Sequence, residues 1–486
     1  MAVRRSIPET ELPSSIGGVP VPPNAPHSKA LHDKAAHGKA AHGPDAKGPA
    51  AHASWSRRTA LAGLGGAAVL AGVALTGTAA NAAEPDGHHT GDVTSKDLNI
   101  VNVRDYGARG DGKTDDTKAF QSALDAVAKS GSVVVVVPPG TYPISTTLNA
   151  TGPVRIVGIG GWSSSELVVA DAVSTGISLK QASTANVYPG PALQLIDLSF
   201  SYAGTGSIVV LDESALHSPF QDTLISGCRF FLGADGTALS SINQRSLMVT
   251  ECQFLGAHTG QGTAIRLNDS DNTTIQQNVF YHLGYCVYGV RGANRTYDAG
   301  IIIMTNSMSS FNEGIYLDGW ETVQAIGNMI DGCATSCIHM IDGYHSIISN
   351  NYLGVTAGSG LLLETKSPYG VKFEGQVQFT SNYFNCYQAG GPAPILLNGI
   401  SAQRPIDQVN IVDNIVNGHP QPAVQLNNAQ NVRVSGNTFR AQASGLVSII
   451  DQTPGKNYIY DNIVDGDIQA DGDVQRDNWT LAPYPS

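Results

Sequence analysis

Residues 326–353 read IGNMIDGCATSCIHMIDGYHSIISNNYL and contain the pattern that decides the fold. An Asn precedes an apolar residue by two positions at Asn328-Met329-Ile330, and this arrangement returns 23 residues later at Asn351-Tyr352-Leu353. A recurrence of 22 to 32 residues is typical of the coils of a solenoid. Successive copies begin at Cys228, Cys252, Asn278, Asn306, Asn328, Asn351, Asn382, Asn414, Asn437 and Asn462.

Between these copies run short segments that alternate strictly, such as Ile315-Tyr316-Leu317-Asp318 and Ile338-His339-Met340-Ile341. Period two places the first and third side chains inside a coil and the second and fourth outside. Equivalent positions of adjacent coils then stack about 4.8 Å apart. A leucine-rich repeat would need Leu-x-x-Leu-x-Leu and a helical segment in each copy, which are missing. We therefore predict an all-β protein, a right-handed parallel β-helix.

The recurring Asn has a structural explanation. At a turn between stacked strands its short amide can adopt left-handed backbone geometry and hydrogen-bond both its own backbone and the Asn of the next coil. We therefore interpret this ladder as architecture and not as chemistry. Cys228 and Cys252 occupy the same position in the first two copies, so we expect them to stack in adjacent coils.

The segment before the repeats reinforces this prediction. Val103 to Gln121 runs from a strand through a glycine turn into an amphipathic pattern, which predicts a short capping helix near Thr114 to Lys129. Thr114 is the expected N-cap, with Asp115 and Asp116 in the first turn.

A buried strand at Val133 to Val137 and the turn Pro138-Pro139-Gly140-Thr141-Tyr142 follow this helix. Together with Val103 to Gln121, these segments resemble the pectate-lyase-like superfamily, which holds family-28-related glycoside hydrolases, rhamnogalacturonase or epimerase-like proteins and phage tailspikes. The resemblance implies a carbohydrate-active β-helix. The polygalacturonase signatures Asn-Thr-Asp, Gly-His-Gly and Arg-Ile-Lys are absent, so no catalytic residue is carried over.

The first 82 residues differ from the rest in composition. The Pro, Ala, His and Lys-rich stretch before Ser56 favours a disordered leader over a metal-binding tail. Arg57-Arg58, an apolar run and Ala80-Asn81-Ala82 resemble a twin-arginine export signal with its cleavage site, although the run from Ala60 to Ala80 is also long enough for a retained anchor. We expect a linker at 83–97, a β-helix over 98–486 with repeats to about 466, and secretion without a membrane anchor.

Charge and cysteine spacing restrict the partners. After residue 82 the chain has 20 Lys and Arg against 36 Asp and Glu, and this negative surface disfavours nucleic acid, whose affinity comes from phosphate neutralisation. None of the six cysteines has zinc-like spacing, so neither a metal nor a cofactor is expected. A polysaccharide or oligosaccharide is the expected partner.

Carboxylates recur at the fourth position of the alternating segments. Asp318 and Glu364 lie two coils apart, with Asp342 at the turn between them, and roughly 9 to 10 Å then separates their backbones. Such spacing suits the paired carboxyls of glycosidic cleavage, and we predict all three as catalytic candidates. Alternatively, Asp318 and Asp342 serve only as turn formers before Gly319 and Gly343. Glu321 is a weaker acid candidate.

The second position carries Arg266, Tyr288, Tyr316, His339 and Leu362 on its column. Arg, Tyr and His are what a polysaccharide lyase needs to neutralise a uronate and move a proton, whereas a non-catalytic surface needs only the aromatic faces.

The predicted substrate-binding residues are Arg266, Tyr288, Tyr316, His339, Lys366 and Arg291. Lys366 has a second interpretation as a solvated charge or a partner of Glu364. The loops at Arg291 to Asp298, Lys366 to Gln376 and Cys386 to Pro394 are expected to wall the cleft.

Outward Ile341, Leu362 and Leu396 suggest a protein interface, so a homotrimer is a further possibility. Three function classes follow from the two columns: a glycoside hydrolase first, a polysaccharide lyase second, and a non-catalytic carbohydrate-binding or adhesive solenoid third.

Overall fold

The computed structural model describes residues 100–480 apart from 131–133, 152–153, 162, 181–192, 213–222, 234, 293–297, 367–374, 388–389, 421, 444 and 454–455. The predicted leader, signal peptide and linker over residues 1–97 lie outside this range. Within it, no helix has the length and apolar character needed to cross a membrane.

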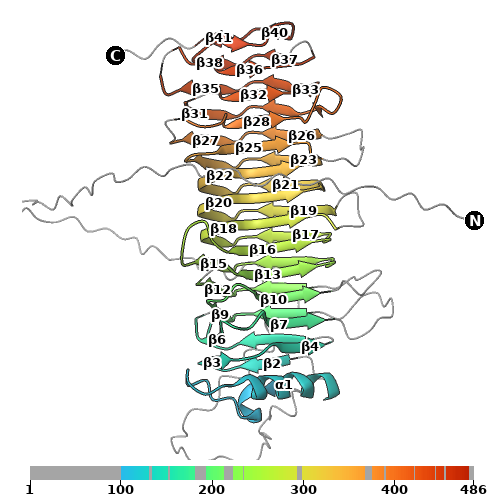
Figure 1. Cartoon of the computed structure of the whole chain (residues 1–486), viewed down its shortest axis with the longest axis vertical. Helices are drawn as coiled ribbons and strands as arrows, with labels where there is room; N and C mark the ends of the chain where they lie inside the picture. Colours follow the sequence, from blue (N-terminus) through green and yellow to red (C-terminus); the bar gives the residue numbers. More distant parts are fainter. Residues whose placement is uncertain are drawn as a thin grey trace, which may run out of the picture. The chain divides into compact units, whose positions relative to one another are not determined.

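Parallel strands wind through the described chain in coils, with one or two strands of a coil in sheet A and one or two in sheet B (Figure 1). The pairings between strands that are successive within a sheet are parallel, as in Asp318 opposite Ile341 and Ile341 opposite Glu364. The predicted right-handed parallel β-helix is confirmed. Sheet A comprises β1 (Ile100–Asn102), β2 (Val134–Val137), β5 (Val154–Gly158), β8 (Leu193–Ile196), β11 (Thr223–Ser226), β14 (Leu247–Thr250), β17 (Thr273–Gln276), β19 (Asp298–Met304), β21 (Trp320–Ile326), β23 (Tyr344–Ser349), β26 (Gly375–Thr380), β29 (Ile406–Asp407), β30 (Asn410–Val412), β33 (Ala429–Gln430), β34 (Arg433–Ser435), β37 (Tyr458–Tyr460) and β40 (Val474–Arg476).

Sheet B bends once in each coil, so it has a first limb that follows sheet A and a second limb beyond the bend. In β18, β20 and β22 one continuous strand crosses the bend. The first limb comprises β3 (Gly140–Ile144), β6 (Ser165–Val169), β9 (Ser199–Tyr202), β12 (Arg229–Leu232), β15 (Gln253–Gly256), β24 (Tyr352–Val355), β27 (Tyr383–Cys386), β31 (Ile415–His419), β35 (Thr438–Ala441), β38 (Ile463–Val464) and β41 (Trp479–Thr480). The second comprises β4 (Leu148–Thr151), β7 (Thr175–Lys180), β10 (Ser207–Asp212), β13 (Thr237–Ile242), β16 (Thr263–Asn268), β25 (Ser359–Glu364), β28 (Ile395–Asn398), β32 (Val424–Asn427), β36 (Ile449–Asp451) and β39 (Ile468–Gln469). The continuous strands are β18 (Val279–Val290), β20 (Ser307–Asp318) and β22 (Met329–Ile341).

The core is built from stacked columns. Phe200, Phe230, Phe254 and Phe280 are fully buried, and each ring lies 5.0 Å from the next. Each of these residues follows a repeat position by two residues or pairs with one that does, so the repeated apolar position fills the interior coil by coil. Parallel rings at this spacing gain dispersion energy and bury large apolar areas.

The Asn ladder runs along the turn between sheet A and sheet B. Asn328 donates through both its backbone N and Nδ2 to Asn351 Oδ1, at 2.9 and 3.0 Å, and its Nδ2 also donates to Ile303 O at 2.9 Å. The predicted architectural role is therefore confirmed. One detail was wrong: the left-handed residue is the one before the Asn, for example Asn350 at φ 56°, and the Asn itself directly precedes the next strand.

The first two ladder positions are cysteines. Cys228 and Cys252 immediately precede Arg229 and Gln253, which pair in register, and both thiols are buried. Their predicted stacking in adjacent coils is confirmed. Burial and the neighbouring Cys228 raise the pKa of the Cys252 thiol well above its ordinary value, so it remains a neutral packing group.

Helix α1 (Thr117–Ser130) packs against β1, β2 and β4 at the first coils, as the predicted capping helix should (Figure 1). It begins three residues later than expected, because Thr114 donates its hydroxyl to Asp111 in a separate turn. Asp115 instead accepts from the backbone N of Thr117 at 3.0 Å. The buried Asp116 accepts from two backbone N–H groups of the preceding glycine turn, which confirms that these aspartates are structural.

Candidate active site

The two predicted outward columns lie on the second limb of sheet B. Register pairs align Arg266, Tyr288, Tyr316, His339 and Leu362 on successive coils, in the predicted order. The neighbouring column follows the chain of pairs Asn268, Val290, Asp318, Ile341, Glu364, Asn398 and Asn427.

Asp318 ends β20 and lies half-buried at the edge of this face. Its Oδ1 is 3.2 Å from Arg291 Nη2, although no described donor makes a hydrogen bond to that oxygen. Burial raises the pKa of Asp318 above its ordinary value; Arg291 opposes the rise, and the negative charge of Asp342 adds to it. The carboxyl of Asp318 is therefore easier to protonate than an exposed aspartate.

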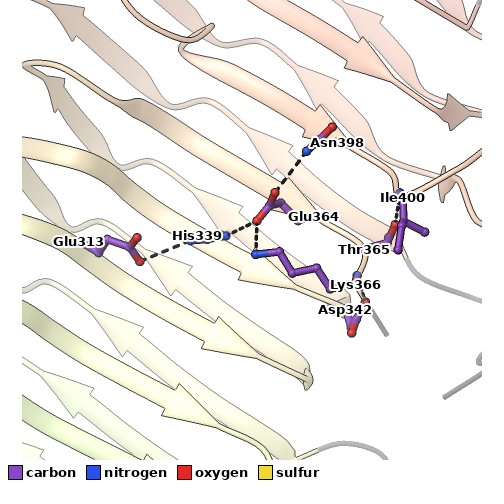
Figure 2. Close-up of polar contacts among 8 residues, drawn as sticks. All are labelled: Glu313, His339, Asp342, Glu364, Thr365, Lys366, Asn398 and Ile400. Carbon is purple, nitrogen blue, oxygen red and sulfur yellow. Dashed lines mark hydrogen bonds and ion pairs between the residues drawn. The ribbon is translucent and has the colours of Figure 1, made fainter. Parts of the chain in front are cut away.

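Glu364 ends β25 and has three polar partners, drawn in Figure 2. Lys366 Nζ lies 2.7 Å from Glu364 Oε2, His339 Nε2 lies 2.9 Å from the same oxygen, and Asn398 Nδ2 donates to Oε1 at 3.2 Å. Burial pushes the pKa of Glu364 upward, but the hydrogen bonds from these three groups outweigh it, so the pKa falls below its ordinary value. Glu364 therefore stays ionised under mildly acidic conditions.

His339 lies between two carboxylates, as Figure 2 shows. Its Nδ1 is 3.3 Å from Glu313 Oε2, and its Nε2 faces Glu364. Glu313 is buried and lies on β20, one coil before His339, but it was not predicted from the sequence. It sits where β20 crosses the bend of sheet B and the register with β22 shifts, so the alternating pattern does not reach it.

An aromatic group lies on the coils that precede His339. The Tyr316 ring meets His339 edge-on at 5.0 Å and stacks on Tyr288 at 4.9 Å, and the Arg266 guanidinium lies 5.0 Å from the Tyr288 ring centre. Burial, followed by the charge of Asp318, raises the pKa of Tyr316, so its phenol retains its proton. Arg266 and Tyr316 cover the two faces of the Tyr288 ring, so this column presents ring edges and hydroxyls beside the carboxylates.

Two predictions about this face were wrong. Asp342 is buried, with φ 50°, and its carboxylate accepts from Lys366 N at 2.8 Å and from Arg291 Nη2 at 3.1 Å. It is a turn residue that binds its own chain and does not face solvent. Ile341 is also buried although it stands at an outward position, so it cannot contribute to an apolar interface.

The other predicted residues are placed as follows. Arg291 is held by two carboxylates, and Lys366 pairs with Glu364, as one of its interpretations foresaw. Glu321 belongs to β21 of sheet A and not to this face. The expected loop walls fall partly outside the described residues, at 293–297, 367–374 and 388–389.

A separate hollow of about 360 Å³ lies on sheet A, away from the candidate active site on sheet B. None of the described residues in its lining has an acidic or basic side chain. Across the described ranges, no three His, Cys, Asp or Glu side chains are grouped to hold a metal ion. The hollow is lined by Gln194, Thr223, Leu224, Ser246, Leu247, Met248, Asn272 and Thr274.

A family model described as "Rhamnogalacturonase A/epimerase, pectate lyase-like" matches residues 100–336. Shorter stretches match two proteins of Azotobacter vinelandii: alginate lyase 7, with 57% identity over 44 residues, and the mannuronan C5-epimerase AlgE6, with 50% identity over 44 residues. Each stretch is 9% of this chain and only 5% of its relative.

Two solved structures resemble the whole solenoid. The A-module of AlgE6 from Azotobacter vinelandii has a TM-score of 0.53 and 15% identity, covering 79% of this chain and 100% of that module. The surface adhesin PfbA of Streptococcus pneumoniae has a TM-score of 0.50 and 16% identity, covering 74% and 93%. At these identities the likeness establishes the fold. Together with the family model, it supports the pectate-lyase-like β-helix superfamily.

Proposed function

We propose that this chain is a carbohydrate-active enzyme that cleaves glycosidic bonds of a polysaccharide bound across the second limb of sheet B. The carrying observation is the pair Asp318 and Glu364, whose pKa values move in opposite directions on one face. Two carboxyl groups whose environments separate their pKa values are suited to divided acid and base roles.

Asp318 is assigned the role of general acid, because its raised pKa favours the protonated form that donates to the leaving oxygen. Glu364 is assigned the ionised role of base. The two lie two register steps apart, roughly 9 to 10 Å between backbones. Backbones at this spacing allow side chains that lean toward each other to bring the carboxyls within the separation of about 6.5 to 9.5 Å that inverting cleavage uses to place a water between them.

The charge of the site favours a neutral polymer. Asp318 and Glu364 are the carboxylates of this face, the buried Glu313 and Asp342 add negative charge beneath it, and the cations Arg291 and Lys366 are already paired with these groups. A uronate chain would meet a negative face, whereas the hydroxyls of a neutral sugar can donate to these carboxylates.

A lyase acting on a uronate polymer is the second candidate. Its support is the Arg266, Tyr288, Tyr316 and His339 column, with a Tyr316 phenol that keeps its proton for the leaving oxygen, and the short stretch shared with alginate lyase 7. A lyase reaction leaves unsaturated sugar ends, whereas hydrolysis does not.

Amide substitutions test the hydrolytic assignment. Asp318→Asn and Glu364→Gln should each lower the release of reducing ends by about a hundredfold or more, since each removes one proton-transfer group. The thermal midpoint should change little, because neither side chain is part of the apolar core. Glu166→Gln is the matched control, since Glu166 lies on β6 of the same sheet, far along the solenoid, and should keep full turnover. Full turnover in both amide variants contradicts the assignment.

Export belongs to this proposal as well. The twin-arginine-like segment lies outside the described residues. The proposal of export is based on the sequence around Arg57-Arg58 and Ala80-Asn81-Ala82. N-terminal sequencing of the secreted chain should find a start near Ala83. A full-length chain retained in the cell would contradict it.

A further inference from the structure

A second group of outward aromatic and polar side chains lies on the first limb of sheet B. It is on the other side of the bend from the candidate active site. Met329, Tyr352, Tyr383 and Ile415 stack in register as one outward column. Met329, Tyr383 and Ile415 are each more than a third exposed. The neighbouring outward column is polar and comprises Ser309, Asp331, Gly354, Asn385, Asn417 and Arg440.

The tyrosines of this surface are oriented by hydrogen bonds. The hydroxyls of Tyr352 and Tyr387 are 2.8 Å apart, and Asn385 Nδ2 donates to both, at 3.3 and 2.7 Å. The Tyr352 and Tyr383 rings stack at 5.9 Å, and 54% of Tyr387 is exposed. The bond from Tyr352, followed by burial and the charge of Asp331, raises the pKa of Tyr387 to about 12, so its phenol stays neutral.

Gly354 makes room for a carboxylate within this group. A Cβ at Gly354 would lie 1.8 Å from Asp331 Oδ1, so no other residue fits while Asp331 keeps its place. The Asp331 side chain therefore lies against the Gly354 backbone, and Gly354 in turn pairs in register with Asn385. The Tyr352 and Tyr383 rings stack on each other, so the surface presents their edges, the exposed Tyr387 ring, an amide and a carboxylate side by side.

We propose that Tyr352, Tyr383, Tyr387, Asn385 and Asp331 form a second carbohydrate-binding surface, which holds a pyranose polymer independently of the candidate active site. A pyranose has apolar C–H faces that pack on aromatic rings and equatorial hydroxyls that need donors and acceptors at the ring edge. The surface supplies both kinds of group at the rung spacing of about 4.8 Å. A protein partner would not need the carboxylate and the amide beside the rings.

Charge selects the class of polymer. Among the five proposed residues Asp331 is the charged one, and Arg440 of the polar column lies two coils beyond Asn385. The ligand is therefore a neutral polysaccharide. The inference shares this substrate class with the proposed function, but not its chemistry.

Affinity electrophoresis through gels containing hydroxyethyl cellulose, laminarin, galactomannan or alginate tests the proposal on the full chain. At least one neutral polymer should retard the wild type. Tyr383→Ala/Tyr387→Ala should weaken that retardation roughly tenfold, as expected for the loss of two stacking rings. Tyr387→Phe keeps the ring and should weaken it less. Tyr458→Ala is the matched control, because Tyr458 is 47% exposed but lies on sheet A.

The outcomes separate this surface from the active site. Glu364→Gln should keep retardation while losing turnover, and Tyr383→Ala, which lies outside the loop expected to wall the cleft, should weaken retardation while keeping turnover on short oligosaccharides. The proposal is overturned if no polymer retards the wild type, if the double variant is retarded equally, or if only Glu364→Gln loses retardation. It is also overturned if sedimentation shows that the wild type is an assembly, that the double variant is a single chain, and that both are retarded equally. The surface would then contact a second copy of the chain.

Discussion

His339 is the residue on which the candidate active site is centred. Each ring nitrogen faces a carboxylate oxygen, Glu313 on one side and Glu364 on the other. Both contacts are hydrogen bonds when the ring carries two protons, or when one carboxyl holds the proton instead. The remaining groups around it are Tyr316 from the preceding coil and Lys366, which shares Glu364 Oε2.

Replacing Glu313 tests whether this buried carboxylate positions His339. Glu313→Gln removes the negative charge behind the ring, so kcat on a proven substrate should fall by about tenfold or more while KM changes little. The pH profile should shift as well, and Glu313→Asp should recover part of the rate. A lower thermal midpoint with an unchanged pH profile would show that Glu313 has only a packing role.

Replacing Lys366 tests the electrostatics of Glu364. Lys366 lowers the pKa of Glu364, so in Lys366→Met the opposing effect of burial should raise it. A base loses activity as the pH falls through its pKa; the acidic limb of kcat/KM should therefore move to higher pH. Lys456→Met, which removes a lysine bonded to Gln430 near the last coils, should leave the limb in place. An unmoved limb in Lys366→Met would exclude Glu364 as the base.

At the scale of elements, β36 and the turn before β40 bring two carboxyls together. Burial, followed by the hydrogen bond with Asp473, raises the pKa of Asp451 from 3.8 to about 6. A folded-state pKa above the unfolded value stabilises the fold at low pH, and this stability is lost as the pH rises through about 6. The last coils should therefore be more stable in acid than at neutral pH.

Asp473→Asn tests this pair. Asp473 Oδ1 accepts from the backbone N of Lys456 and Asn457, which an asparagine oxygen can still do. The new amide N–H can donate to Asp451 and removes the repulsion, so the thermal midpoint at pH 7 should exceed that of the wild type. Near pH 4 the gain should vanish. The exposed Asp471→Asn is the control; a gain of equal size at both pH values would contradict the coupling.

The columns were predictable from sequence because period two and the Asn repeat together fix register. Tyr316, His339 and Glu364 accordingly lie where alternation placed them. Glu313 was not predictable, since it sits at the bend where β20 and β22 shift register. Asp342 was misplaced because it adopts a left-handed turn and pairs with Arg291 from two coils earlier, and alternation describes neither feature. Ile341 stands at an outward position but is buried.

For the molecule as a whole, stacking turns single residues into a continuous face. Amides extend the site beyond Glu364, where Asn398 and Asn427 follow in register, and Tyr316, Tyr288 and Arg266 extend it the other way. A polymer that crosses successive coils would meet aromatic surfaces before the carboxylates and amides after them. The homotrimer stays a prediction, and the buried Ile341 is no longer part of the apolar interface expected for it.

The most direct test of the proposed chemistry is the nature of the products. Purified chain is incubated with neutral and uronate polysaccharides, and each digest is read for new reducing ends and for the ultraviolet absorbance of unsaturated ends. Cleavage by Asp318 and Glu364 predicts reducing ends from a neutral polymer with no absorbance. Absorbance from a uronate polymer, or no reducing ends from any neutral polymer, would contradict it.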